Sequence, residues 1–290
     1  MQYSHMSSTM NTVKYLGVVG LAAAGLFAAQ AFATTCPTAP ATGTQTQGGP
    51  TCIAPVGQDG AGTGLNSLYG PGGTGVTGTG LNIYNGQYTP SSNWQIGSTT
   101  GSFNIILTEI AGNAQVNTFG IYDPNHPGTM LELFSGGDSA GAKGTLVYNG
   151  GGNFQFAIFG QSATSATFTD GASFGYYLGT PSGFFYSNPA LNNGADQAGN
   201  PYSDGMHQMV AYEGGNGTKI NGATFLSNEF LLAWEDTAFT NSDLDYNDFV
   251  VLVESVHSVP EPATLGMFGF GMLLIGAGVA LSRRRRFNIG

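Results

Sequence analysis

The sequence predicts an all-β fold, a single jelly-roll-like β-sandwich, over residues 63–258. Short apolar or alternating runs are separated there by Gly, Asn, Asp and Pro clusters, which is typical of sandwiches and barrels. The 47 glycines suit tight turns, and they follow no strict three-residue period, which excludes collagen. No apolar repeat of 3.6 residues persists away from the two ends of the chain, so no long helix is expected between them.

Several runs show the period of two that a half-buried strand requires. The three clearest apolar stripes are Phe103, Ile105 and Leu107; Phe154, Phe156 and Ile158; and Phe230, Leu232 and Trp234. Asn104 falls on the face opposite the first stripe. Residues 250–253 are apolar on both faces, which predicts a central, buried strand. Further strands are expected at 118–122, 130–134, 145–148, 166–168, 174–178 and 208–212.

The N-terminal residues 1–33 are predicted to be a signal peptide in a helical segment. Lys14 supplies the positive n-region and residues 15–32 supply the apolar h-region. Ala31 and Ala33 form an A-x-A cleavage motif. A permanent transmembrane helix is the alternative, but the small residues and the cleavage motif favour removal. We therefore expect export through the inner membrane.

Residues 34–62 are rich in Thr, Gly, Pro and Gln, and are interpreted as a flexible or loosely stapled leader. Both cysteines, Cys36 and Cys52, lie in this segment. An exported chain meets an oxidising compartment, so a disulfide between them is expected. No histidine lies near them in the sequence, which argues against a zinc site or a catalytic thiol.

The C-terminal residues 259–290 have three parts. They are the motif Pro260, Glu261 and Pro262, an uncharged apolar run at 263–281, and the cluster Arg283, Arg284, Arg285 and Arg286. As a helix, the run would cover roughly 28 Å, close to the ~30 Å hydrocarbon thickness of a bilayer. The arginines would stay in the cytoplasm, so the body of the protein would lie outside it.

The body of the chain is strongly acidic. Between residues 34 and 262, only Lys143 and Lys219 are basic, against all 17 acidic residues. Binding of nucleic acid or of an anionic membrane surface needs clustered Lys and Arg, so we expect the body to bind neither. A body of this charge attracts cations instead.

Negative charge is concentrated between residues 235 and 248. The candidate metal ligands are Glu235, Asp236, Asp243, Asp245, Asn247 and Asp248, with Asp123 and Asp204 as additional candidates. Like charges this close destabilise a fold, and a bound hard cation offsets the repulsion. Calcium takes about six to eight oxygen ligands of these types, so a calcium site is expected. Asx-turns on a solvated loop are the alternative.

The C-terminal pattern from Val259 onward resembles the PEP-CTERM sorting signal in all three of its parts. That resemblance implies processing by an exosortase, a membrane-embedded cysteine protease. It also implies that the apolar helix anchors the protein in the membrane only transiently, before the protein reaches the cell surface or the extracellular matrix.

Residues 65–256 resemble the exported domain type DUF4114. The residues that carry this resemblance are Leu232-Ala233-Trp234-Glu235-Asp236 and Asp243-Leu244-Asp245-Tyr246-Asn247-Asp248-Phe249-Val250-Val251. Supporting stretches lie at 117–123 and 173–178, together with Asp204 and His207. The resemblance implies a β-rich fold and calcium binding, and it implies no reaction.

The expected function is therefore that of an exported, non-enzymatic surface or matrix protein associated with exopolysaccharide or biofilm. A carbohydrate-binding module is an alternative that would need exposed Tyr or Trp side chains. A glycan-acting hydrolase, pairing Glu109 or Glu132 with Glu213, is less favoured. The sequence has no nucleophile motif of the G-x-S-x-G type and little sign of a histidine-based triad.

Overall fold

β-Strands are the main regular secondary structure of the described residues, as the sequence predicts. The computed structural model describes Cys36, Thr38 and residues 43–48, 51–55, 62–110, 113–192, 207–238 and 241–259. All of them belong to one compact unit of the chain, Ala33–Gly290. Outside the described residues lie the signal peptide with Ala31 and Ala33, Asp204, and the sorting signal from Pro260 onward, including the arginines at 283–286.

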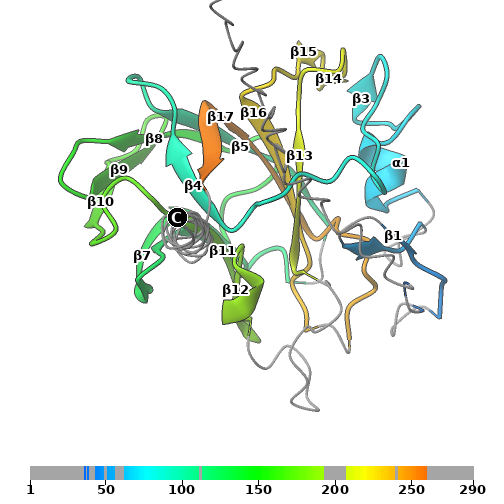
Figure 1. Ribbon diagram of the computed structural model, residues 1–290, viewed down its shortest axis with the longest axis horizontal. Helices are drawn as coiled ribbons and strands as arrows, with labels where there is room; N and C mark the ends of the chain where they lie inside the picture. Colours follow the sequence, from blue (N-terminus) through cyan, green and yellow to red (C-terminus); the bar gives the residue numbers. More distant parts are fainter. Residues whose placement is uncertain are drawn as a thin grey trace, which may run out of the picture. The chain divides into compact units, whose positions relative to one another are not determined.

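Two antiparallel sheets hold most of the strands (Figure 1). Their members are β5 (Ser102–Glu109), β6 (Thr118–Asp123), β7 (His126–Phe134), β8 (Lys143–Tyr148), β9 (Asn153–Ile158), β10 (Thr164–Thr167), β11 (Gly175–Thr180), β12 (Gly183–Tyr186), β13 (Met209–Glu213), β16 (Glu229–Trp234) and β17 (Phe249–Glu254). The seven-stranded sheet has the order β10-β9-β8-β5-β17-β16-β13, and the four-stranded sheet has the order β12-β11-β6-β7. A late strand, β17, therefore lies inside the larger sheet, next to its middle strand β5.

Short strands form three further small sheets. They are β1 (Gln47–Gly48), β2 (Cys52–Ile53), β3 (Val76–Thr77), β4 (Asn93–Ile96), β14 (Lys219–Ile220), β15 (Ala223–Thr224) and β18 (Val256–Val259). In the described ranges the helical elements are α1 (Leu65–Tyr69) and the 3₁₀ turn η1 (Pro189–Leu191). No helix in this part of the chain combines the length and the apolar character needed to cross a membrane.

The two larger sheets share one hydrophobic core. It takes Phe119 and Tyr176 from the four-stranded sheet and Phe230, Trp234 and Phe249 from the seven-stranded sheet. Phe119 stacks on Tyr176 with ring centroids 5.5 Å apart, and on Phe249 at 5.4 Å. Such offset aromatic pairs add to the gain from burial, so the aromatic stripes of the sequence hold the two sheets together.

A second hydrophobic core covers the other face of the seven-stranded sheet. Leu231 and Val250 of that sheet pack there with Leu65 of α1 and Ile53 of β2. The segment expected to be a loose leader therefore contributes buried residues, and Ile53 has no exposed surface. A disulfide joins Cys36 to Cys52, with Cα atoms 5.5 Å apart.

Burial on both faces explains one departure from the predicted pattern. In β5 the fully covered residues are Ser102, Asn104 and Ile106, while Phe103 and Ile105 are only partly buried. The predicted apolar stripe does share one side of β5, where Ile105 and Leu107 pack against the second core, but the opposite side is also covered, with Ile106 in the main core. Asn104 instead points to the main core, where its Nδ2 donates to the backbone oxygen of Ser102 at 2.9 Å.

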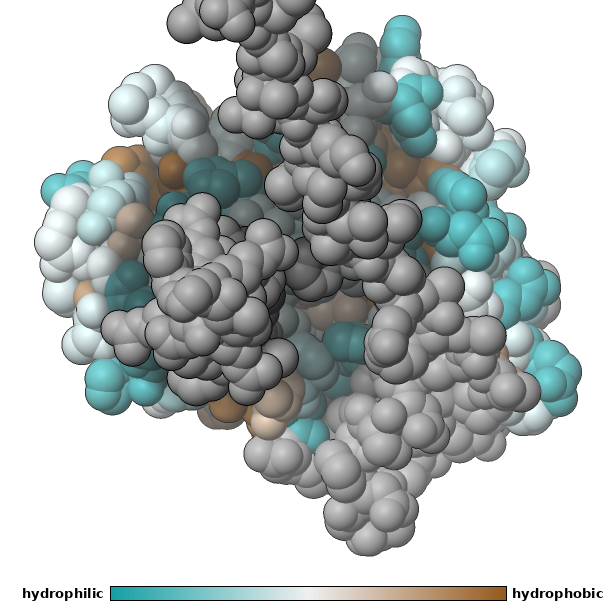
Figure 2. All heavy atoms as spheres, viewed as in Figure 1, coloured by the Kyte–Doolittle hydropathy of each residue, from teal (hydrophilic) through white to brown (hydrophobic). Residues whose placement is uncertain are grey.

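The predicted central strand is confirmed. All residues of β17 except Glu254 are buried, with alternate side chains in the two cores. Few large apolar side chains of the described part remain exposed, namely Val116, Phe159, Phe184 and Leu226. The visible described surface is accordingly mostly hydrophilic or neutral, with small apolar patches (Figure 2).

Candidate metal centre

The acidic segment is the connection between two paired strands. β16 ends at Trp234 and β17 begins at Phe249, and these two residues are partners in the antiparallel ladder. Glu235 and Asp248 are therefore brought to the same end of the strand pair, as the sequence predicts. The backbone N–H of Asp236 donates to Oδ2 of Asp248 at 2.8 Å, which closes the base of the loop.

Three carboxylates converge inside this loop. Glu235, Asp243 and Asp245 each offer an oxygen that lies within 4.8 Å of the other two. Glu235 and Asp245 are fully buried, and Asp243 is half-buried. Three oxygens at this separation fit around one cation, and a cation there would offset the repulsion between the three negative charges.

The backbone of the loop directs these side chains inward. Leu244 and Tyr246 have left-handed backbones, with φ of 59° and 55°. That conformation costs a residue with a side chain about 1–2 kcal/mol. It persists here because the side chains of Leu244 and Tyr246 are buried in the second core. The acidic residues alternate with these two anchors.

Glu235 is the most constrained of the three acids. Its carboxylate accepts hydrogen bonds from the hydroxyl of Ser242 and from the backbone N–H of Tyr246, the latter at 2.5 Å. Burial, together with the negative charges of Asp243 and Asp245, raises the pKa of Glu235 well above its usual range, although the two hydrogen bonds oppose the shift. A positive charge at this position would reverse that shift.

Asn247 supplies a further oxygen beside the cluster. Its Nδ2 donates to Oδ2 of Asp245 at 2.7 Å and to the backbone oxygen of Thr63 at 3.0 Å, which fixes the orientation of the amide. The remaining atom, Oδ1, is buried and accepts no hydrogen bond within the described part of the chain. A buried amide oxygen in this condition costs about 1–3 kcal/mol unless something else satisfies it.

Asx-turn bonding is also present. The backbone N–H of Asn247 donates to Oδ1 of Asp245 at 3.2 Å. The loop is nevertheless buried rather than solvated, so an exposed Asx-turn does not describe it.

Asp236 and Asp248 lie beside the three converging carboxylates. The carboxylate of Asp236 accepts a hydrogen bond from Nδ2 of Asn117 at 2.9 Å. Burial and the charges of Glu235 and Asp236 raise the pKa of Asp248 well above its usual range.

Sequence reasoning missed Ser242 and Asn117 as supports of the loop. Ser242 lies inside the acidic segment, so its hydroxyl was a usable signal.

The structure places Asp123 elsewhere. Its carboxylate accepts hydrogen bonds from the backbone N–H and the hydroxyl of Thr169, both at 2.6 Å, and from the N–H of Asn125 at 3.0 Å. It lies at the end of β6 remote from Asn117, roughly 17 Å along the strand. Burial alone would raise the pKa of Asp123, but these hydrogen bonds and nearby His126 lower it below 3.8.

His207 contacts the loop through its backbone. Its carbonyl oxygen accepts a hydrogen bond from the hydroxyl of Tyr246. Burial lowers the pKa of the His207 imidazole.

The carboxylate pairs considered for a hydrolase are not brought together. Glu213 is on β13, three strands away from Glu109 on β5, or about 14 Å at the usual spacing of strands. Glycosidases need separations of roughly 5–9.5 Å. Glu132 is on β7, which contacts β9 and β10 at the edge of the larger sheet opposite β13.

Comparison with protein-family models, with curated proteins and with solved structures gives no match.

Proposed function

We propose that the protein is an exported, non-enzymatic component of the cell surface or extracellular matrix whose domain is stabilised by calcium. The observation that supports the ion is the convergence of Glu235, Asp243 and Asp245 in a buried loop. Their oxygens, with the amide oxygen of Asn247 nearby, match the preference of calcium for oxygen ligands. Zinc prefers nitrogen and sulfur ligands, which this cluster lacks.

We further propose that the domain is a single β-sandwich of jelly-roll type. The core shared by the seven-stranded and four-stranded sheets supports it, since sheets packed face to face define a sandwich. The calcium loop would then tie strands β16 and β17 of the larger sheet to residues 51–55 and 62–65. Backbone bonds from Ala54 to Leu244 and from Leu65 to Asp245 support this link.

Export, sorting and association with extracellular polysaccharide belong to the same proposal. Their support is the sequence of the two ends of the chain and its resemblance to exosortase substrates. The apolar run at 263–281 would hold the protein in the inner membrane only until an exosortase removes the tail near Pro260, Glu261 and Pro262. Fractionation of cells with and without the exosortase tests this, and a full-length protein that stays in the inner membrane of normal cells contradicts it.

Calorimetry of the purified protein tests the ion. A ligand that binds only the folded state stabilises it by about 2.7 kcal/mol at one hundred times its Kd. We expect a higher Tm in millimolar calcium than in EDTA, and a smaller rise with magnesium. Equal Tm values in EDTA and calcium would reject the calcium site.

The carbohydrate-binding alternative draws little support from aromatic side chains. Every Tyr and Trp in the described part is buried or half-buried, and Trp94 and Trp234 have no exposed surface. A flat aromatic platform of Tyr or Trp is therefore not present in that part. Any recognition of sugar there needs a different kind of site.

A further inference from the structure

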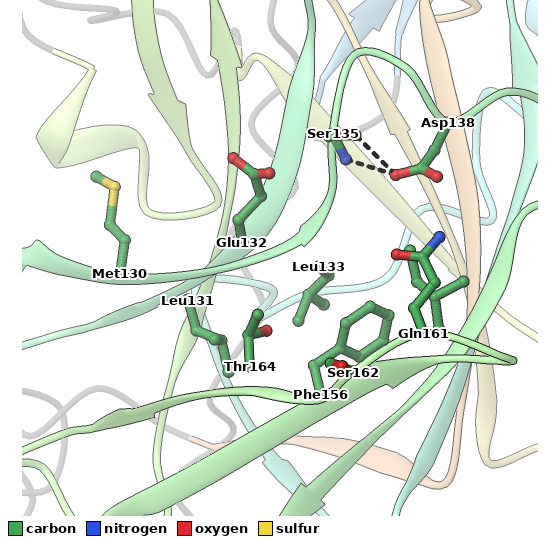
Figure 3. Close-up of a pocket in the computed structure, with 11 residues that line it drawn as sticks. Met130, Leu131, Glu132, Leu133, Ser135, Asp138, Phe156, Gln161, Ser162 and Thr164 are labelled. Carbon is green, nitrogen blue, oxygen red and sulfur yellow. Dashed lines mark hydrogen bonds between the residues drawn. The ribbon is translucent and has the colours of Figure 1, made fainter.

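A pocket opens where the edges of the two larger sheets approach each other (Figure 3). β7 is the edge strand of the four-stranded sheet, and β10 is an edge strand of the seven-stranded sheet. The volume of the pocket is about 210 Å³. Pockets for drug-sized ligands measure roughly 300–1,000 Å³, so this one suits a ligand of about one sugar ring.

The floor of the pocket is apolar. Leu131, Leu133 and Phe156 line it, and all three belong to the core between the sheets. Figure 3 shows Leu131 and Leu133 on one side of β7, toward the ring of Phe156, and Glu132 projecting from the other side of the strand. Such a floor favours a ligand with a C–H face over a bare metal ion, which would need oxygen atoms on all sides.

The rim of the pocket is polar and negatively charged. Its polar members are Glu132, Ser135, Asp138, Gln161, Ser162 and Thr164. Oδ2 of Asp138 accepts hydrogen bonds from the N–H and the hydroxyl of Ser135, both at 2.9 Å, so this carboxylate is held in place. No basic side chain is among the residues that line the pocket.

The negative charge of the pocket rim favours a ligand that carries a positive charge. Two carboxylates face a concave, partly apolar space, and such a space attracts a cation more strongly than an open surface does. Burial and the charge of Asp138 raise the pKa of Glu132, so the approach of a positive group would be favourable there. The amide of Gln161 and the hydroxyls of Ser162 and Thr164 can each exchange hydrogen bonds with sugar hydroxyls.

We propose that this pocket binds one residue of an amino sugar whose amine is free and protonated. The pyranose C–H face would lie over the apolar side of the pocket, where Met130 and Ile158 are partly exposed. The amine would pair with Glu132 and Asp138, and the hydroxyls would bond to the side of Gln161. This deepens the proposed association with polysaccharide and rests on it for the choice of a sugar. It is independent of the calcium loop, which calorimetry tests separately.

The test is an NMR titration of the purified protein in calcium, at mildly acidic pH, that follows the side-chain amide of Gln161. The probes are glucosamine, N-acetylglucosamine and cyclohexylamine. Glucosamine has both the charge and the hydroxyls, so we expect it to bind with the lowest Kd. N-acetylglucosamine lacks the charge and cyclohexylamine lacks the hydroxyls, so each binds more weakly.

The variants Glu132→Gln and Asp138→Asn should each raise the Kd of glucosamine by about two- to five-fold, the range measured for partly exposed ion pairs. Glu213→Gln makes the same chemical change at the opposite edge of the larger sheet and should leave that Kd unchanged. The inference is overturned if glucosamine does not bind, or if N-acetylglucosamine or cyclohexylamine binds equally well. It is also overturned if neither carboxylate variant weakens the binding of glucosamine.

Discussion

At the scale of single residues, the acidic loop combines buried acidic side chains with residues in an unfavourable backbone conformation. Glu235 and Asp245 have no exposed surface, and Leu244 and Tyr246 have left-handed backbones. Features of this kind cluster at functional sites, because the surrounding structure must compensate for them. Here the compensation comes from the buried side chains of the two anchors and, in our proposal, from a cation.

Replacing Glu235 by glutamine distinguishes two effects of its negative charge, the repulsion from Asp243 and Asp245 and the binding of a cation. The amide keeps one oxygen, which can accept from the N–H of Tyr246, its NH2 can donate to the hydroxyl of Ser242, and it carries no charge. We expect Glu235→Gln to lose the rise in Tm on adding calcium, and in EDTA to be at least as stable as the unmodified protein. Calorimetry in both buffers measures this. A variant that keeps the full calcium effect, or that is much less stable than wild type in EDTA, contradicts it, and Glu213→Gln is the matched control.

Asp123 predicts a dependence of stability on pH. Its folded-state pKa is lowered, so the carboxylate contributes stability above pH 3.8, and this contribution is lost as pH falls through the folded value. Asp123→Asn should cost about 1–3 kcal/mol at neutral pH, because three donors lose a charged acceptor. The difference from wild type should shrink below pH 3.8. Urea denaturation at several pH values measures both, and a constant difference would disagree with this assignment.

At the scale of elements, the strand pair β16–β17 fixes both the cores and the loop. Every residue of β16 is buried, and its side chains alternate between the two cores. The ends of the two strands meet at the partners Trp234 and Phe249, so their packing sets where Glu235 and Asp248 lie. Any loss of order in this pair would therefore move the acidic loop.

Two leucine truncations test the element. Leu232 in β16 has no exposed surface, whereas Leu226 is 51% exposed. Leu232→Ala should cost about 2–5 kcal/mol, since it leaves a cavity in the main core. Leu226→Ala should change stability by less than about 0.5 kcal/mol. Chemical denaturation measures both, and equal effects would contradict the burial assigned to β16.

The sequence shows some elements better than others. The apolar runs of β9, β16 and β17 predict strands that the structure confirms, because their side chains alone indicate burial. The apolar stripe of β5 was visible, but the burial of Ser102 and Asn104 on the other side of that strand was not, because both side chains are polar. The acidic loop was visible as a concentration of charge. Its support from Thr63 was not, because that contact joins residues 184 positions apart.

At the scale of the whole molecule, the acidic loop links the start of the domain to its end. The N–H of Ala54 donates to the oxygen of Leu244 at 2.7 Å, and the N–H of Leu65 donates to the oxygen of Asp245 at 3.1 Å. The disulfide partner Cys52 belongs to the same buried segment. If the loop binds calcium as proposed, the order of residues 51–55 and 62–65 should therefore depend on that ion.

Hydrogen exchange tests this dependence. In EDTA we expect the amides of Ala54 and Leu65 to exchange about tenfold or more faster than in calcium, since local opening that costs about 1.4 kcal/mol less is tenfold more frequent. The amide of Leu178, in the middle of β11, serves as the internal control. Unchanged rates at Ala54 and Leu65 would show that the loop and this segment are not coupled through the ion.

The position of β17 bears on when the domain can form. This strand lies between β5 and β16, although it comes last in sequence among the strands of its sheet. Without residues 249–254, β5 and β16 have no strand between them, and both hydrophobic cores lack the side chains of β17. The domain consequently cannot close in stages from its first residue onward. Its larger sheet is complete only once nearly the whole chain is available, which would suit the export that we propose, in which the chain is threaded through a membrane before it folds.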